Sequence, residues 1–467
     1  MAVSLEKMKM HLNPEAAAVL AGGTNLSNRK LRIAVWHNLP SGGAKRALWH
    51  YVSGLVQRGH HVEAWCPPTA DRSYQSLEDI CPEHVVPLTV YGSATAPKFI
   101  RWVANNVIVR RQIRAMREHS RACAKQIQAQ GFDVLLANAC SSFAAPAIGR
   151  FMDIPAALYL GEPLRRLYEV LPNVIWPAPA PRSKSQTVCS WPRLLANTLK
   201  LSAQRIQMRE ELDNARHFDR ILVNSAFSRE SVLRAYGLDS FVCRLGIDTE
   251  QFRPTGQPVE KYIMGLGAVH YHKGVDRAIE ALGLVPTAVR PKLLWVGNVA
   301  DAAYMADLQQ RAKHLGVDFE TRVMVKDDEL ISLLSRAAAL LYTSRLEPFG
   351  LAPLEANACG TPVIAIAEGG VRETIVPGEN GVLVPDARPQ SIASAIQYYF
   401  ENPAQAAALR AKCRSAVVSR WGMAASVEGL EKSLRDVIQT ATQSARLNHT
   451  DHTPDSKPNP ILAFRHS

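Results

Sequence analysis

The sequence SRLEPFGLAPLEANACGTPVIAIAEGG occupies residues 344–370 and combines a short helix pattern, an apolar run and two glycine positions. A helix is expected from about Pro348, because proline is tolerated in a first turn, to Gly360, which is a favourable C-cap. The apolar run 361–366 is typical of a strand buried within a parallel sheet. The stretch therefore predicts a helix that leads directly into a strand of an α/β domain.

Two glutamates belong to this predicted helix. Glu347 lies at its mouth and Glu355 about two turns further along. The free amides at a helix N-terminus attract anions, and Gly350 would let a ligand approach the backbone closely. These features predict a site for a diphosphate flanked by hydroxyl groups. Two glutamates at this spacing are, by themselves, more typical of a solvated surface loop, so the residues around them carry the functional argument.

Those surrounding residues resemble a known signature. EPFGLAPLEA followed by GTPVI is similar to the Glu-x7-Glu motif of glycosyltransferase family 4, whose members are retaining, use nucleotide sugars and have the GT-B fold. The resemblance covers roughly residues 31–440. It implies an α/β chain of two Rossmann-like domains that face each other across a cleft. The donor would bind mainly to the second domain and the acceptor mainly to the first.

A strand–helix–strand unit near the start of the chain fits this expectation. The apolar run 31–36 is followed by Gly42 and Gly43, an amphipathic helix to Gln57 and a second apolar run at 61–65. Such a glycine loop lies at the carboxyl edge of a parallel sheet, where ligands bind. A lone Gly-Gly is equally typical of a tight turn. Here GGA with a later RGHHV resembles the family's first motif, which implies that the loop approaches donor and acceptor.

The resemblance assigns roles to the donor-side residues. Lys273 is expected to be catalytic and to hold the leaving diphosphate together with amides near Gly350 and Leu351, with Phe349 also in the donor site. Glu347 is the expected catalytic carboxylate that contacts the donor sugar and stabilises its oxocarbenium-like state. Glu355 is expected to accept hydrogen bonds from the ribose hydroxyls.

The chain departs from the family pattern at Ala268, where an arginine usually shares the diphosphate charge with the lysine. Another cation must then help, or donor affinity is reduced. The sequence offers four candidates for that cation, which are His270, His272, Arg345 and Arg372.

The acceptor side departs from the pattern as well. Gly161 stands where many family members carry a histidine near the reacting sugar, and the following residues Glu162-Pro163-Leu164-Arg165 resemble a sequence found in some relatives. Glu162 and Arg165 are therefore the acceptor-side candidates. A glutamate here is equally suited to complement the dipole at a helix N-terminus.

The net charge of +12 is concentrated in two segments. Residues 98–130 hold eight lysines and arginines against the single acid Glu118, and residues 172–209 hold six basic residues and no acid. The first segment is predicted to be a long helix from Pro97 to Gln130, and the second an irregular insertion followed by a helix. An anionic membrane surface or an acidic acceptor would suit this charge. An ordinary helix with solvated arginines is an equally good interpretation.

Five regions are expected along the chain. They are a disordered segment 1–29, an acceptor-side domain 30–253, a nucleotide-sugar domain 254–420, a helix 421–443 that packs back on the first domain, and a disordered tail 444–467. No apolar run approaches the roughly 18 residues of a membrane span. No signal pattern or paired cysteine spacing is apparent, so we expect a cytoplasmic protein with free thiols. A peripheral location on the inner face of the membrane stays open.

The chain has no Asp-x-Asp motif, so a metal-independent reaction without a cofactor is expected. The resemblance implies a retaining transferase. Because no second-wall nucleophile is evident, we expect same-face attack with the leaving phosphate as the base. The transferase would move a hexose from GDP-mannose or a UDP-sugar to a lipid-linked or polysaccharide acceptor in cell-envelope or exopolysaccharide synthesis. Three alternatives remain open at this point. They are a non-catalytic nucleotide-sugar-binding protein, another GT-B enzyme such as an epimerase or a phosphorylase, and a nucleic-acid binder, which the charge alone suggests.

Overall fold

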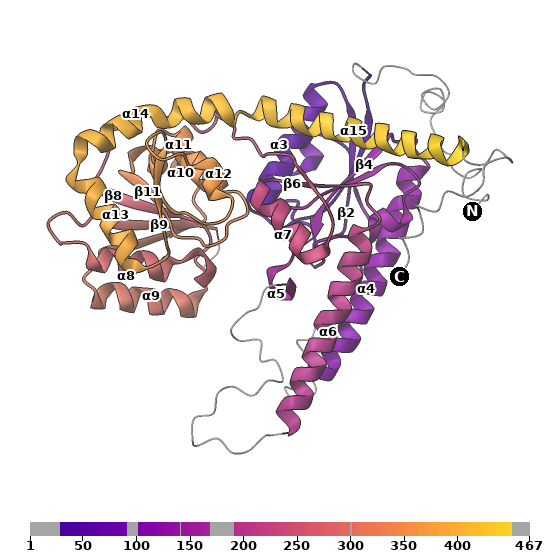
Figure 1. The fold of residues 1–467 in the computed structure, drawn as a ribbon, viewed down its shortest axis with the longest axis horizontal. Coiled ribbons are helices and arrows are strands. Elements are labelled where there is room, and N and C mark those ends of the chain that lie inside the picture. The colour runs from indigo at the N-terminus through magenta and orange to yellow at the C-terminus, as the bar shows by residue number, and fades with distance from the viewer. Residues whose placement is uncertain (1–28, 91–100, 141, 169–190, 299–300, 451–467) are drawn as a thin grey trace.

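The structure, a computed structural model, describes residues 29–90, 101–140, 142–168, 191–298 and 301–450. Within these ranges the chain forms two parallel β-sheets, each covered by helices, and its last two helices lead from the second sheet's domain back to the first (Figure 1). The α/β fold of two domains that the sequence predicted is confirmed. The predicted disordered segment 1–29 lies outside the described residues apart from Arg29.

The first domain is a seven-stranded sheet in the order β3-β2-β1-β4-β5-β6-β7. Its strands are β1 Arg32–Asn38, β2 His61–Cys66, β3 Glu83–Val85, β4 Val134–Cys140, β5 Ala156–Tyr159, β6 Arg220–Val223 and β7 Phe241–Val242. Its helices are α3 Gly43–Gln57, η1 Leu77–Asp79, α4 Arg101–Gln128, η2 Ala147–Phe151, α5 Arg165–Tyr168, α6 Trp191–Ala215 and α7 Ala226–Tyr236. The central strands are buried on both faces, which explains their continuous apolar sequences.

The second domain is a six-stranded sheet in the order β10-β9-β8-β11-β12-β13. Its strands are β8 Tyr262–Leu266, β9 Lys292–Gly297, β10 Phe319–Val323, β11 Ala339–Tyr342, β12 Val363–Ile366 and β13 Gly381–Val384. Its helices are η3 Tyr271–Lys273, α8 Val275–Leu284, α9 Ala302–His314, α10 Asp327–Arg336, α11 Leu351–Ala358, α12 Val371–Thr374, α13 Pro389–Glu401 and α14 Pro403–Arg420.

Both sheets reverse their strand order at one point. In the first domain the reversal lies between β1 and β4, and in the second between β8 and β11. Ligands of open parallel sheets bind outside the carboxyl ends of the strands at such a point. The glycine loop follows β1, the Lys273 segment follows β8, and the Glu347 loop follows β11. The fold therefore brings three motifs that are distant in sequence to the carboxyl edges of the two sheets.

The helix expected from Pro348 begins later, at Leu351, and this prediction was wrong by three residues. Gly350 has a left-handed backbone (φ 104°), so it ends the preceding loop instead of continuing a helix through Pro348. Glu347 consequently lies in the loop before α11, and Glu355 lies in its second turn. The buried strand after it is confirmed as β12.

Helix α14 lies against the second domain, and the C-terminal helix α15, Met423–Thr450, runs along the first domain (Figure 1). It packs against α3, where the side chain of Val427 covers Gly54. The helix extends to Thr450, so residues 444–450, which were predicted to be the start of a disordered tail, are helical instead. Residues 451–467 of the predicted tail lie outside the described residues.

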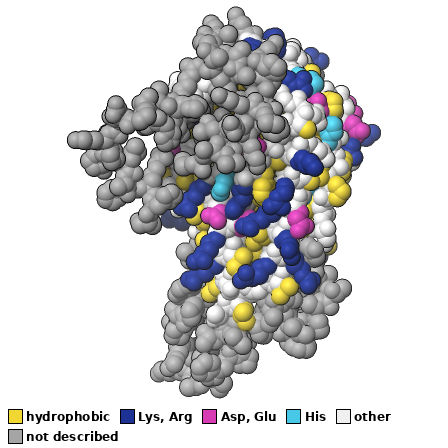
Figure 2. Space-filling view, turned by 90° about the vertical axis from the view of Figure 1, so that its right-hand side faces the viewer, with side chains coloured by type: hydrophobic (Ala, Val, Ile, Leu, Met, Phe, Trp, Pro, Cys, Tyr) yellow, Lys and Arg dark blue, Asp and Glu magenta, His cyan; other side chains and the backbone are white. Residues whose placement is uncertain are grey.

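Helices α4 and α6 pack side by side and project from the first domain (Figure 1). The predicted long helix is confirmed from Arg101 to Gln128, whereas most of the predicted insertion, residues 169–190, lies outside the description. Figure 2 shows lysines and arginines with hydrophobic side chains between them on the face that lies at the right of Figure 1. Part of the basic charge is neutralised internally, because Glu210 of α6 accepts two hydrogen bonds from Arg117.

None of the described helices is both long and apolar enough to cross a membrane. The seven cysteines within the described residues are free and buried, which agrees with the expectation of unpaired thiols.

Candidate active site

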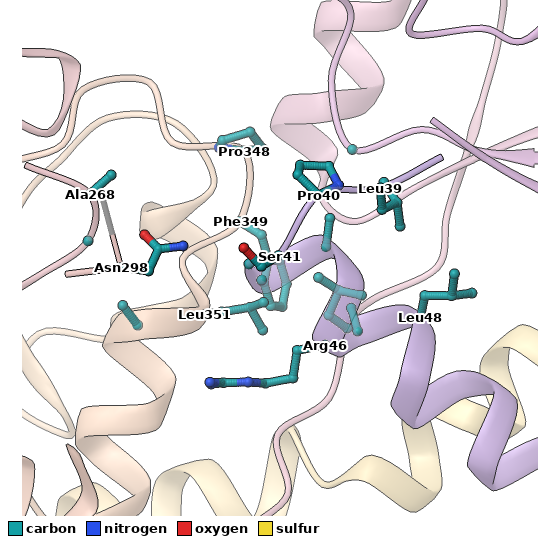
Figure 3. Close-up of a pocket in the computed structure, with 18 of the residues that line it drawn as sticks. Leu39, Pro40, Ser41, Arg46, Leu48, Ala268, Asn298, Pro348, Phe349 and Leu351 are labelled. Carbon is teal, nitrogen blue, oxygen red and sulfur yellow. The ribbon is translucent and has the colours of Figure 1, made fainter. Parts of the chain in front are cut away.

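The carboxyl edges of the two sheets face each other around a cavity of about 810 Å³. Its walls come from both domains. Figure 3 shows Leu39, Pro40 and Ser41 of the first domain opposite Ala268 and Asn298 of the second, with the loop from Pro348 to Leu351 between them. Most of the predicted site residues line this cavity, namely Gly42, Gly43, Glu162, Lys273, Glu347, Phe349, Gly350, Leu351 and Glu355.

Several contacts hold the two domains together around the cavity. The Ser225 hydroxyl at the start of α7 donates to the carbonyl of Pro348, at 2.5 Å. The amides of Ala226 and Phe227 both donate to the carboxylate of Glu373 in the second domain, each at 3.1 Å. A carboxylate at a helix N-terminus complements the helix dipole. The cleft is therefore closed by specific polar contacts.

The loop that carries Glu347 is shaped by a second glycine pair. The Gly370 amide donates to the Glu347 carbonyl at 2.7 Å. A Cβ atom at Gly370 would lie 2.1 Å from the Pro348 carbonyl oxygen, and one at Gly369 would lie 2.4 Å from that of Glu347. Leu346 has a positive φ of 51°, which is uncommon for leucine. The Glu-Gly-Gly end of the motif thus supports the backbone of the loop that carries Glu347.

We predict that Gly370→Ala destabilises the protein by about 1–3 kcal/mol, the usual cost of overpacking, and lowers turnover. Gly370 has an ordinary φ of −71°, so the effect is steric and does not arise from backbone strain. Thermal unfolding and steady-state rates measure it. Gly429→Ala in α15 is the matched control, because its Cβ meets no atom within 4 Å and alanine favours a helix. Equal stability of the two variants would contradict this interpretation.

Glu347 is paired with Lys273. The lysine Nζ lies 2.8 Å from Glu347 Oε2, and the Ser344 hydroxyl donates to the same oxygen at 2.8 Å. Burial would raise the pKa of this carboxyl, but Lys273 and the hydrogen bonds outweigh burial and lower the pKa below its usual value. The site therefore presents an ionised carboxylate beside an ammonium group.

Glu355 is paired with a residue that the sequence analysis missed. Arg46 of α3 reaches toward the second domain (Figure 3), and its Nη1 lies 2.5 Å from Glu355 Oε1. Arg46 Nε donates to the Tyr74 hydroxyl at 2.9 Å, and Nη2 lies 3.6 Å from Asp327. Burial opposes the charge of Arg46, but Glu355, Tyr74 and Asp327 together raise its pKa. One carboxylate of the predicted donor site is therefore held from across the cleft.

The candidate replacements for the missing arginine lie elsewhere. The basic side chains among the described residues that line the cavity are Lys273 and Arg46. Arg345 pairs with Glu368 at 2.9 Å, and Arg372 donates to the Gly369 carbonyl at 3.3 Å. Burial, Lys273 and His270 lower the pKa of His272 to about 4, so its imidazole is neutral near pH 7. The expectation that one of these four supplies the second cation finds no support in the geometry.

Two family profiles cover most of the chain. The profile described as "Glycosyltransferase Family 4" matches residues 41–251, and that described as "Glycosyl transferases group 1" matches residues 247–416. The two matches overlap at residues 247–251, in the segment between the two sheets. The chain belongs to glycosyltransferase family 4.

Relatives of this family 4 chain include D-inositol 3-phosphate glycosyltransferase 1 of Catenulispora acidiphila, which is 31% identical over 41% of this chain and 51% of its own length. A GDP-mannose-dependent alpha-(1-6)-phosphatidylinositol dimannoside mannosyltransferase of Mycobacterium tuberculosis is 28% identical over 45% of this chain and 57% of its own. The chain thus spans about half the length of the curated relatives that it matches.

Solved structures show the same fold over nearly the whole family 4 chain. Sucrose-phosphate synthase of Thermosynechococcus elongatus superposes with a TM-score of 0.64 at 20% identity, covering 88% of this chain and 100% of that one. HepE of Anabaena, crystallised with UDP, gives 0.61 at 18% identity, covering 87% and 100%. The GT-B fold predicted from the sequence is confirmed.

The acceptor-side candidates of the family 4 chain also meet at the cleft. Arg165 Nε donates to Glu162 at 2.7 Å, and its two terminal nitrogens donate to the carbonyls of Leu346 and Arg345. Arg165 therefore links the first domain to the loop before Glu347. Gly161 lines the cavity, and a Cβ there would have only ordinary contact, 3.7 Å from Asn224 Nδ2.

One group of potential metal ligands lies apart from this cavity. The ligand atoms of His37 on β1, Cys66 on β2 and Glu83 on β3 lie within 4.8 Å of one another. Glu83 is already bonded to His37 and Arg72, and the buried Lys45 ammonium interacts with it as well. Two cations beside the only carboxylate disfavour a divalent ion there. Metal independence of the reaction stays a prediction.

Proposed function

We propose that this chain is a retaining glycosyltransferase that moves a hexose from a nucleotide sugar, GDP-mannose or a UDP-sugar, to a lipid-linked or polysaccharide acceptor. Cell-envelope or exopolysaccharide synthesis would be its setting. One observation carries the proposal. The Lys273–Glu347 ion pair lies beside the N-terminus of α11, inside the cavity between the two domains of the GT-B fold. A relative named for its dependence on GDP-mannose supports that donor class.

The proposed roles of the site residues follow from where charge develops during glycosyl transfer. Breaking the anomeric bond leaves negative charge on the diphosphate and positive character on the sugar ring. Lys273 and the first-turn amides of α11 would stabilise the diphosphate, since a helix leaves those donors unpaired. The ionised Glu347 would stabilise the sugar ring. The closed cleft would exclude water and so favour transfer over hydrolysis.

Retention would follow from attack on the face that the diphosphate leaves. The first-domain wall offers Glu162, which is held by Arg165 and therefore poorly placed as a nucleophile. The leaving phosphate would then take the proton of the acceptor hydroxyl. NMR of the first-formed anomer tests this step, and an inverted product would exclude it.

Mass spectrometry of the purified chain with a panel of GDP- and UDP-sugars tests the proposed function. One donor is expected to be bound or slowly hydrolysed without an acceptor, and to be consumed faster when glycosides are added. The absence of binding and turnover with every donor would contradict the proposal.

We predict that EDTA leaves donor turnover unchanged within about twofold, because Lys273 and the α11 amides would perform the charge neutralisation that a metal supplies elsewhere. Turnover is measured after dialysis against EDTA and again after added Mg²⁺ or Mn²⁺. A loss that the added metal restores would contradict metal independence.

A non-catalytic nucleotide-sugar-binding protein is the second candidate. Ala268 and Gly161 favour it, because two polar side chains that the family usually provides are absent from the cavity wall. Tight donor binding with neither hydrolysis nor transfer above background would establish this alternative.

We further propose that the exposed face of α4 binds an anionic membrane surface. Arg110, Arg111, Arg114 and Arg121 are exposed there. Vesicles of phosphatidylcholine with phosphatidylglycerol should bind the protein in a salt-sensitive way, and Arg110→Gln with Arg114→Gln should weaken binding by roughly 1 kcal/mol per residue. Arg388→Gln, on an exposed site of the other domain, is the control. Equal binding to neutral vesicles or to duplex DNA would contradict this assignment.

A further inference from the structure

Three neighbouring strands of the first sheet end at the same part of the cavity wall. Asn138 lies on β4, Gly161 follows β5, and Asn224 follows β6 directly. Strand β5 lies between the other two, and Asn138 is in register with Tyr159. All three residues line the cavity. The wall therefore places one side-chain amide on each side of Gly161.

The two amides have unused hydrogen-bonding capacity. Asn138 is 7% exposed, and its Nδ2 is buried without a partner among the described residues. Asn224 is also 7% exposed, and its Oδ1 accepts from the Ser228 hydroxyl at 2.8 Å, which fixes the amide orientation. Its Nδ2 then faces the position of a Cβ at Gly161, 3.7 Å away. An unmet buried amide costs about 1–3 kcal/mol, so a ligand oxygen at this place would be stabilising.

Gly161 provides the space for such a ligand. Its φ is not in the left-handed region, and Asn224 Nδ2 is the nearest atom that a Cβ would meet. The backbone therefore does not require glycine here. What the glycine leaves is an opening between the two amides, where a larger residue would project into the cavity.

The charges on this wall select against an anionic group. Glu162 and Asp71 are the acidic residues that the first domain contributes to the cavity, among the described residues. The nearby arginines already have partners. Arg46 is paired with Glu355, and Arg165 is paired with Glu162 and donates to two carbonyls. A phosphate near Glu162 would lose its hydration without gaining a cation. Hydroxyl groups suit amides and carboxylates, because they both accept and donate.

We infer that Asn138, Asn224 and the opening at Gly161 form a subsite for the hydroxyl groups of a neutral acceptor sugar, and that the site rejects acceptors phosphorylated on that ring. This inference rests on the proposed function and specifies its acceptor class. Asn138 and Asn224 act as specificity-determining residues that bind the acceptor.

Paired probes test the subsite in the full-length chain. The neutral probes are p-nitrophenyl α-mannoside and α-glucoside, and the matched anionic probes are their 6-phosphates. Saturation-transfer NMR measures binding of each probe with the product nucleotide present, and steady-state rates measure transfer. We expect binding and transfer with at least one neutral glycoside and at least tenfold weaker use of its phosphate. Equal or better use of the phosphate would overturn the inference, as would failure of both neutral probes to bind.

Variants separate an acceptor role from a donor role. Asn224→Ala and Asn138→Ala should each raise the acceptor KM by about tenfold, corresponding to roughly 1.4 kcal/mol. The donor KM, measured by hydrolysis without an acceptor, should rise less than the acceptor KM. Gly161→Val should also lower acceptor kcat/KM. Because a side chain at residue 161 has room, this variant should fold even if an asparagine variant does not. Gln57→Ala, an exposed amide on α3, is the control. An unchanged acceptor KM, or a raised donor KM in its place, would overturn the assignment.

The outcome also distinguishes the two levels of inference. If the wild-type chain neither binds nor hydrolyses any donor, the proposed function fails, and the NMR comparison of neutral and phosphorylated glycosides still decides the subsite. If transfer occurs but the variants leave acceptor use unchanged, only the subsite fails.

Discussion

Glu347→Gln is expected to lower turnover by roughly 100- to 1000-fold, the size typical for removing one preorganised electrostatic group. Glutamine keeps the shape of the side chain and its contact with Ser344, but it removes the charge that would stabilise the sugar ring. Nucleotide binding should change little, because Lys273 and the α11 amides remain. Steady-state rates and calorimetric nucleotide affinity measure the two effects separately.

The matched control is Glu368→Gln, because Glu368 belongs to the same motif but is paired with Arg345 outside the cavity lining. Its turnover should remain near that of the wild-type chain. Normal turnover in Glu347→Gln would remove Glu347 from the catalytic role. A loss of nucleotide affinity as large as the loss of turnover would instead make it a binding residue.

The pH dependence follows from the same ion pair. Because Lys273 lowers the pKa of Glu347, the carboxylate stays ionised from neutral pH to below its ordinary pKa of 4.5. Any stabilisation that depends on its charge is lost only as the pH falls through that lowered pKa. A rate that already declines between pH 7 and pH 5 would have to arise from another group.

Local patterns sufficed for the fold because each element is encoded by its own residues. The apolar run 31–36 predicted β1, which spans Arg32–Asn38, and the run 361–366 predicted β12. The start of α11 could not be found this way. It depends on the left-handed Gly350 and on the hydrogen bond from the Gly370 amide to the Glu347 carbonyl, which is a tertiary contact.

The site was predictable where a single domain carries it and not where both domains contribute to it. Lys273 and Glu347 were both expected in the donor site, and the two side chains lie 2.8 Å apart. Arg46 was missed because its partner, Glu355, is 309 residues away along the chain. Its one local signal is its place in the first turn of the helix after Gly42-Gly43, at the edge of the sheet that faces the cleft.

Arg46→Ala is expected to lower donor kcat/KM by roughly 10- to 100-fold. Removing one partner of a buried ion pair leaves the other charge uncompensated, which costs about 3–5 kcal/mol in a fully buried case. Arg46 and Glu355 are 15% and 8% exposed, so a smaller value is expected. In the variant, Glu355 and Asp327 of the second domain would both lose their ion pair with Arg46. The closed cleft would also lose a contact. Donor kinetics and the radius of gyration from X-ray scattering measure both consequences.

Arg46→Lys should give an intermediate loss, because lysine keeps the charge but cannot contact Glu355, Asp327 and Tyr74 together. The double variant Arg46→Ala with Glu355→Ala should cost less than the sum of the single changes, since each removes the same interaction. Arg234→Ala is the control, because its pair with Glu230 is exposed on the same domain and contributes little. Additive losses, or an unchanged donor kcat/KM in Arg46→Ala, would mean that Glu355 takes its position without help from the first domain. If Arg46→Ala enlarges the radius of gyration but leaves donor kcat/KM unchanged, the arginine serves only to close the cleft.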